Sequence, residues 1–258
     1  MSEGQLGIDR DGPVLRVTFN RPERRNALTW QMYDGLVDAC ERADSDTGIR
    51  VLVLRGAGDQ AFVAGTDIEQ FLEFGDGPDG VAYEARMAAI LERLTRVRVP
   101  VVAVINGYCV GAGLAIAAAC DLRIAGRSAR FGMPIARTVG NCASMTACSL
   151  LAAHFGPGRT LDLLLRARMM DASEAAAAGF VTELCDDDRV DSVAAEVVER
   201  LLQHAPLSMW AAKEAMRRLR TSGLPDDDDI VRRVYGSADF RTGVRAFLAK
   251  RPPEWMGA

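Results

Sequence analysis

The feature that most constrains the fold is an apolar stretch near residues 99–119 that is interrupted by turn-forming residues. Val101–Ile105 is wholly apolar, as expected of a strand buried on both faces. Asn106-Gly107 then favours a turn, and Gly111–Ala119 consists mostly of small residues. A proline and several glycines make the stretch a poor membrane span. It predicts a buried strand, a turn and a helix that packs closely against a neighbour.

The rest of the chain is predicted to place strands first and helices last. Strands are expected at 14–19, 51–54, 122–125, 130–132 and 179–181, loops at 61–65 and 75–80, and helices at 29–43, 68–74, 81–96, 142–154, 157–166 and 172–178. From residue 190 onward the pattern is helical, with breaks near 206, 225 and 236. This order predicts an α/β core over residues 1–200 and a helical C-terminal segment at 201–258.

Charge and cysteine usage exclude several classes of protein. The 31 basic and 35 acidic residues give a net charge of −4, so nucleic acid is not an expected partner, and neither is a membrane. The six cysteines form no CxxC pair and have no histidine at metal-ligand spacing. They predict reduced thiols, no metal site and a cytoplasmic location, since the N-terminus has no apolar leader. Lysine is scarce: only Lys213 and Lys250 occur.

The glycines after the buried strand do not fit a nucleotide site. Gly111 and Gly113 begin a dinucleotide-like pattern, but Ile116 stands where the third glycine belongs and Asp121 follows too soon. A small-residue helix start instead leaves backbone N–H groups free to face an anionic oxygen. The turn at Phe62–Ile68 has the same character. Two such turns predict an oxyanion hole, a pair of donors that converge on one oxygen.

Several short segments follow one another in a specific order along nearly the whole chain. They are Asn20–Pro22 with Asn26–Leu28, Ala61–Ile68, Pro100–Gly113 with Cys120–Ala125, Phe131–Pro134, and Phe247–Pro253. On these segments the sequence resembles the crotonase superfamily, the enoyl-CoA hydratase/isomerase family. The resemblance implies a spiral of ββα units and a homo-trimer or dimer of trimers, with 201–258 serving oligomerisation. It also implies an acyl-CoA substrate, whose coenzyme A is part of the substrate, and no prosthetic group.

The resemblance also implies roles for individual residues. It places the two oxyanion-hole N–H groups on Ala64 and Ala112. Coenzyme A contacts would fall on Arg24, Arg25, Ala27, Ala64, Gly65, Thr66, Asp67, Ile68, Phe247 and Lys250. The last two could come from the same subunit or from a neighbouring one.

The sequence departs from the family at the positions where hydratases carry two glutamates. Those positions hold Ala115 and Ile135 here, and neither side chain can move a proton. Standard hydration and isomerisation are therefore in question. A water, a substrate group, Thr138 or Asn141 could take the role of base. Decarboxylation, which yields an enolate without a protein base, is an attractive alternative among lyase and isomerase reactions.

Other interpretations remain open from the sequence alone. The protein could be a non-catalytic acyl-CoA-binding protein, or a structural oligomer without a ligand. Ala64 and Ala112 could be packing residues, Asp67 could cap a helix as well as position the ligand loop, and Asn141 could be a helix cap. Lys250 is equally balanced between ligand binding and an ordinary surface position.

Overall fold

The computed structural model describes residues 5–222 and 228–254. The strands are β1 Gln5–Asp11, β2 Val14–Asn20, β3 Val51–Gly56, β4 Ala61–Val63, β5 Val101–Ile105, β6 Tyr108–Val110, β7 Leu122–Gly126, β8 Arg130–Gly132, β9 Met169–Asp171 and β10 Glu183–Cys185. The α-helices are α1 Trp30–Ser45, α2 Gly77–Thr95, α3 Ala112–Ala119, α4 Ile135–Thr138, α5 Met145–Leu165, α6 Ala172–Ala177, α7 Val190–Gln203, α8 Pro206–Thr221, α9 Asp228–Tyr235 and α10 Ala238–Leu248. Short 3-10 turns lie at η1 Pro22–Arg24, η2 Ile68–Phe71 and η3 Asp187–Arg189.

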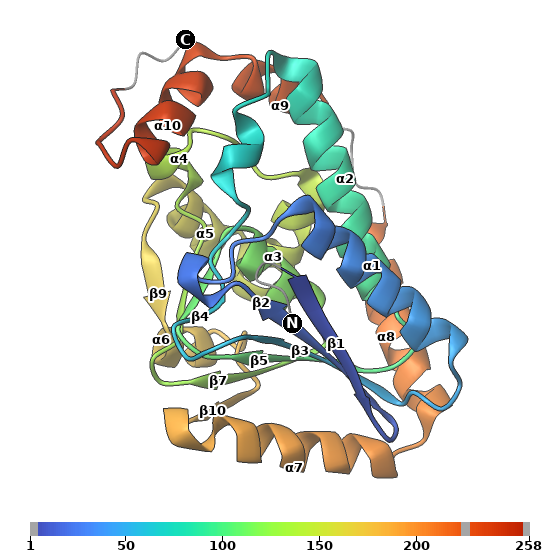
Figure 1. Cartoon of the computed structure of the whole chain (residues 1–258). Helices are drawn as coiled ribbons and strands as arrows, with labels where there is room; N and C mark the ends of the chain where they lie inside the picture. The colour runs from blue at the N-terminus through green and yellow to red at the C-terminus, as the bar shows by residue number, and fades with distance from the viewer. Residues whose placement is uncertain (1–4, 223–227, 255–258) are drawn as a thin grey trace.

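The strands form two sheets (Figure 1). The larger has the order β1-β2-β3-β5-β7-β10, and it is parallel except for the antiparallel β1–β2 hairpin at one edge. The smaller has the order β4-β6-β8-β9. From β3 to β8 consecutive strands alternate between the sheets: β3, β5 and β7 lie in the large sheet, and β4, β6 and β8 lie in the small one. The turns that follow β4 and β6 are brought side by side by this arrangement.

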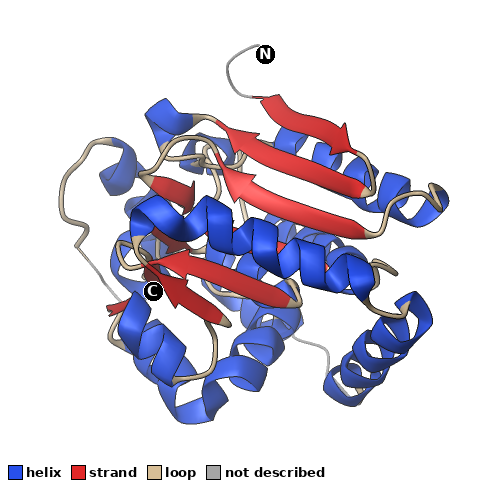
Figure 2. Cartoon of the chain, turned by 90° about the horizontal axis from the view of Figure 1, so that it is seen from below, coloured by secondary structure: helices blue, strands red, loops and turns tan. Residues whose placement is uncertain are grey.

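Alternating side chains of the large sheet pack into two different cores. Leu52 and Leu54 of β3 join the main core with α1, α2, α3 and α5. Val51 and Val53 point the other way, into a smaller core closed by α7. Figure 2 shows α7 lying over that face of the sheet, roughly along its strands. A sheet covered on both faces explains why its central strands read as continuous apolar runs.

The predicted α/β core followed by helices is confirmed, with local corrections. The loop expected at 61–65 contains β4, and the strand expected at 179–181 lies at Glu183–Cys185. The loop expected at 75–80 ends early because α2 begins at Gly77. Three-residue strands carry little local signal, since they are stabilised by neighbours distant in sequence. No helix in the ranges 5–222 and 228–254 is both long and apolar enough to span a membrane.

Arg123 fixes the C-terminal end of α3. Its side chain lies in the interior, 4% exposed, where burial lowers the pKa of the guanidinium. It donates to the carbonyls of Ala117 (3.1 Å), Cys120 (2.7 Å), Asp121 (3.2 Å) and Phe180 (2.5 Å). The carbonyls at the end of a helix lack N–H donors within the helix, and here the guanidinium supplies hydrogen-bond donors in their place. This contact holds α3 in place, and the opposite end of α3 faces the cavity described below.

We expect folding stability to fall as the pH is lowered from about 6.5 to about 4 because of His154. Its Nε2 donates to the Ala118 carbonyl at 2.9 Å, and burial, then the charge of Arg123, lowers the pKa from 6.5 to about 4. The unfolded chain therefore takes up a proton before the folded one does, so stability present above about 6.5 is lost toward pH 4. Urea unfolding should be measured near both ends of this pH range. Between them the free energy of unfolding should fall less in His154→Gln than in the wild type. Equal losses would contradict the assignment.

Candidate active site

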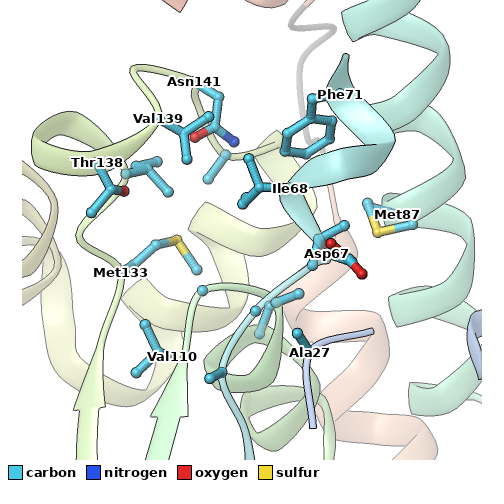
Figure 3. A pocket seen from close by; sticks show the side chains of 18 of the residues that line it. Ala27, Asp67, Ile68, Phe71, Met87, Val110, Met133, Thr138, Val139 and Asn141 are labelled. Atoms are coloured by element: carbon cyan, nitrogen blue, oxygen red, sulfur yellow. The ribbon is translucent and has the colours of Figure 1, made fainter. Parts of the chain in front are cut away.

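A cavity of about 460 Å³ lies between the segment 23–27, the turn before η2, α2, the first turn of α3 and the α4–α5 connection. Figure 3 shows Thr138, Val139 and Asn141 on one side, with Ile68 and Phe71 opposite them. The residues singled out from the sequence that line it are Arg24, Arg25, Ala27, Ala64, Gly65, Thr66, Asp67, Ile68, Ala112, Ala115, Ile135, Thr138, Asn141 and Phe247. Lys250 is not among the lining residues.

The N–H of Ala64 is not available to a ligand in this structure. It donates to the carbonyl of Arg25 at 3.0 Å. The expectation that Ala64 supplies an oxyanion donor is therefore wrong for this conformation, although Ala64 still lines the cavity. Residue types alone cannot tell which amide of Ala64-Gly65-Thr66 is left unpaired, because the competing carbonyl comes from a distant loop.

Thr66 provides a free amide close by. Leu28 donates to the Gly65 carbonyl and accepts from the Asp67 N–H, both at 2.9 Å. In this parallel bridge the N–H of Thr66 points away from Leu28, and it has no acceptor among the hydrogen bonds of the described residues. Thr66 also lines the cavity, so its amide is a candidate donor to a ligand.

The side chain of Thr66 is held by two tyrosines. Its Oγ1 lies 2.7 Å from the Tyr33 hydroxyl and 2.8 Å from the Tyr83 hydroxyl. Burial is the main cause that raises the pKa of both tyrosines, so both stay protonated at neutral pH. A chain of three buried hydroxyls thus restrains Thr66 and, with it, the direction of its N–H.

Ala112 provides the second free amide at the start of α3. The first N–H groups of a helix have no acceptor within it. The N-cap, Gly111, has φ 57° and ψ −121°, a conformation open to glycine. A Cβ at Gly113 would lie 2.1 Å from the Val63 carbonyl, so only glycine lets α3 approach β4 this closely. A Cβ at Gly111 would lie 3.6 Å from the Gly65 Cα, which shows that the two turns are in contact.

Polar contacts hold the segment 21–27 against the Asp67 turn. Asp67 caps η2 with one oxygen, as one of its two expected roles requires, and its other oxygen pairs with Arg21 at 2.8 Å. Arg21 also donates to the Ala27 carbonyl at 3.0 Å. Asn26 is fully buried and donates to the Ala61 carbonyl at 2.7 Å. These contacts fix the rim of the cavity at the side where Arg24 and Arg25 lie.

The two positions that lack glutamates both face this cavity. Ala115 lies on α3 and is 5% exposed, and Ile135 begins α4. The wall is therefore apolar at both positions. The hydroxyl of Thr138 donates to the Pro134 carbonyl at 2.9 Å, so its proton is used within α4.

Sequence reasoning missed a buried carboxylate in the cavity wall. Glu84 of α2 is 6% exposed. It accepts hydrogen bonds from the Tyr235 hydroxyl at 2.5 Å and from the Ser144 N–H at 2.9 Å, where α5 begins. The signal was present in the pattern, because Glu84 shares a helical face with Met87 and Leu91. An acidic residue on an apolar face needs partners when it is buried.

The C-terminal helix contributes to the cavity of its own chain. Phe247 and Leu248, at the end of α10, line it. Lys250 lies beyond α10 with an exposed side chain. The other lysine, Lys213, has a structural role, since it pairs with Asp121 and donates to the carbonyl of Val99. Neither of the two lysines lines the cavity, so the scarcity of lysine in the sequence did not point to a cavity residue.

The fold and the cavity define an α/β protein with two unpaired backbone amides at touching turns. The chain belongs to the enoyl-CoA hydratase/isomerase family, whose family model matches residues 9–258. This confirms the resemblance found in the sequence segments.

Individual relatives are similar over almost their whole length. A 2,3-dehydroadipyl-CoA hydratase of Escherichia coli is 30% identical over 257 residues, which is 98% of this chain and 99% of the relative. A 1,2-epoxyphenylacetyl-CoA isomerase of the same organism is 32% identical over 251 residues, 95% of each chain. A crystal structure of an enoyl-CoA hydratase/carnithine racemase from Magnetospirillum magneticum has a TM-score of 0.81 and 35% identity, and covers 100% of this chain and 97% of the other.

Proposed function

We propose that this protein is an enzyme that binds an acyl-CoA thioester and stabilises its enolate through the N–H groups of Thr66 and Ala112. The observation that carries the proposal is the pair of amides at touching turns, which line one cavity and have no acceptor among the described residues. Donors aimed at a developing oxyanion in a water-poor cavity typically contribute roughly 2.7–4 kcal/mol each. The names of the similar proteins support a CoA thioester as the ligand.

The reaction that we propose is loss of carbon dioxide from the α-carbon of the acyl group, because Ala115 and Ile135 offer no base. The bond between the α-carbon and the carboxylate carbon breaks, and carbon dioxide leaves. The electron pair of the broken bond enters the enolate, whose negative charge falls on the thioester oxygen between the two amides. The α-carbon then takes up a proton from water. An apolar wall favours the first step, since it solvates a carboxylate poorly.

The coenzyme A moiety would lie along the rim of the cavity. Arg24 and Arg25 line that rim, and their guanidinium groups can pair with phosphate. The acyl group would then reach inward, past Ile68, toward α2 and α10. We also propose that the segment 201–258 serves assembly into a homo-trimer or dimer of trimers, because α8 carries the exposed apolar side chains of Leu207 and Leu219.

A panel of CoA thioesters tests the proposed reaction. We expect turnover of a malonyl-type thioester, followed as release of carbon dioxide, and little hydration of crotonyl-CoA, followed as loss of enoyl absorbance. Rapid hydration would show that another group replaces the glutamates. Absence of any binding by calorimetry would overturn the acyl-CoA assignment itself.

A non-catalytic acyl-CoA-binding protein is the second candidate. The apolar side chains of Ala115 and Ile135 in the cavity favour it, since they leave binding intact while removing the usual proton-transfer groups. It predicts tight binding with no turnover of any thioester in the same panel. Turnover of one thioester would exclude it.

A further inference from the structure

Asn141 lines the cavity, and Figure 3 places it across the cavity from Val110, which precedes the turn that carries Ala112. Figure 3 shows the Asn141 side chain directed from the α4–α5 connection toward the cavity. Its Nδ2 donates to the Tyr235 hydroxyl at 3.3 Å and to the Cys142 carbonyl at 3.4 Å. Its Oδ1 is buried and finds no donor among the residues that the structure describes.

The neighbours of Asn141 fix which end of the amide faces the cavity. Burial, and then the nearby charge of Glu84, raises the pKa of Tyr235 well above its ordinary value, so this tyrosine stays protonated. Its single proton is donated to Glu84 at 2.5 Å. Toward Asn141 the Tyr235 oxygen can therefore only accept, and the Cys142 carbonyl can only accept too. Both contacts require the NH₂ group, which leaves Oδ1 as an acceptor on the cavity wall.

We infer that Asn141 is a specificity residue that selects acyl groups carrying a hydroxyl at the end remote from the thioester. This inference rests on the proposed acyl-CoA function. A hydroxyl donates its proton to Oδ1 and satisfies a buried acceptor that a methyl group leaves unpaired. A carboxylate at the same place brings a negative charge to an acceptor oxygen and to the neighbourhood of Glu84. Hydroxyl-ended chains are accordingly preferred over methyl-ended chains, and carboxylate-ended chains are rejected.

Calorimetric titration with saturated, unreactive thioesters tests the inference. The probes are butyryl-, hexanoyl- and octanoyl-CoA, each with a methyl end, a hydroxyl end and a carboxylate end. At the chain length that reaches Asn141, the hydroxyl form should bind about ten-fold more tightly than the methyl form. Equal binding of the two forms at every length would overturn the inference and leave the proposed function standing. If no thioester of any kind binds, the proposed function fails instead.

Two variants show whether the preference depends on the oriented amide. Asn141→Leu removes the acceptor, and Tyr235→Phe removes the hydroxyl that orients the amide, so both should lose the ten-fold preference. Tyr108→Phe is the matched control, because it removes the hydroxyl of an exposed tyrosine that does not line the cavity. It should keep the preference. A preference that persists in both Asn141→Leu and Tyr235→Phe would overturn the inference.

Discussion

Ala112→Pro should lower kcat/KM for the thioester that the enzyme turns over by about a hundred-fold or more. Proline has no N–H, so the substitution removes one of the two proposed oxyanion donors. The first position of a helix accepts proline well, and Ala112 occupies that position in α3. Gly111, which precedes it, is not in the right-handed helical region that proline disfavours in its neighbour. The loss should therefore appear in activity with the unfolding temperature little changed.

Ala112→Gly is the matched control for this substitution, because it keeps the backbone N–H while changing the side chain. Its activity should stay within a few-fold of the wild type. Steady-state kinetics of both variants, with circular dichroism to compare their folding, make the test. Full activity in Ala112→Pro would show that the α3 amide does not stabilise the reaction.

Arg123→Leu should lower the free energy of unfolding by at least about 3 kcal/mol. Leucine fills part of the space but donates no hydrogen bond. The carbonyls of Ala117, Cys120, Asp121 and Phe180 would then lose the donor that they share. Removing a buried charge together with its counter-charge can be neutral, but backbone carbonyls stay in place when the arginine is lost. Equilibrium unfolding in urea measures the change.

Arg123→Lys separates charge from geometry. Lysine keeps the positive charge but has a single donor group in place of the planar guanidinium, which reaches several carbonyls at once. We expect a stability between those of the wild type and Arg123→Leu. If Arg123→Leu were as stable as the wild type, the capping role of Arg123 would be excluded.

The sequence predicted the parts of the fold that depend on local pattern. β5 has the expected bounds, and the helix expected at 29–43 is α1, which Thr29 caps through a side chain that accepts from the Met32 N–H. The strands of the small sheet were harder to predict. β4 and β6 have only three residues each, and they form because they pair with each other across an intervening helix and strand. Such pairing leaves no periodicity in a short window.

The cavity was predicted better than its chemistry. The turns around Gly65 and Gly111 could be recognised, because small residues at the start of a helix leave backbone N–H groups free to face a ligand. The expectation that Ala64 is the donor was wrong, because the Ala64 N–H donates instead to the Arg25 carbonyl. Glu84 and Tyr235 were missed, since a contact between α2 and α9 brings together residues that are far apart along the chain.

The position of α10 has a consequence for biosynthesis. The ribosome makes Phe247 and Leu248 after every other element of the cavity has been synthesised, yet both residues line it. Tyr235, which orients Asn141, also emerges late. A nascent chain can therefore assemble both sheets before the last residues that line the cavity have been synthesised. Translation that stops before α9 would release a polypeptide with the strands of both sheets but without Phe247, Leu248 and the tyrosine that orients Asn141.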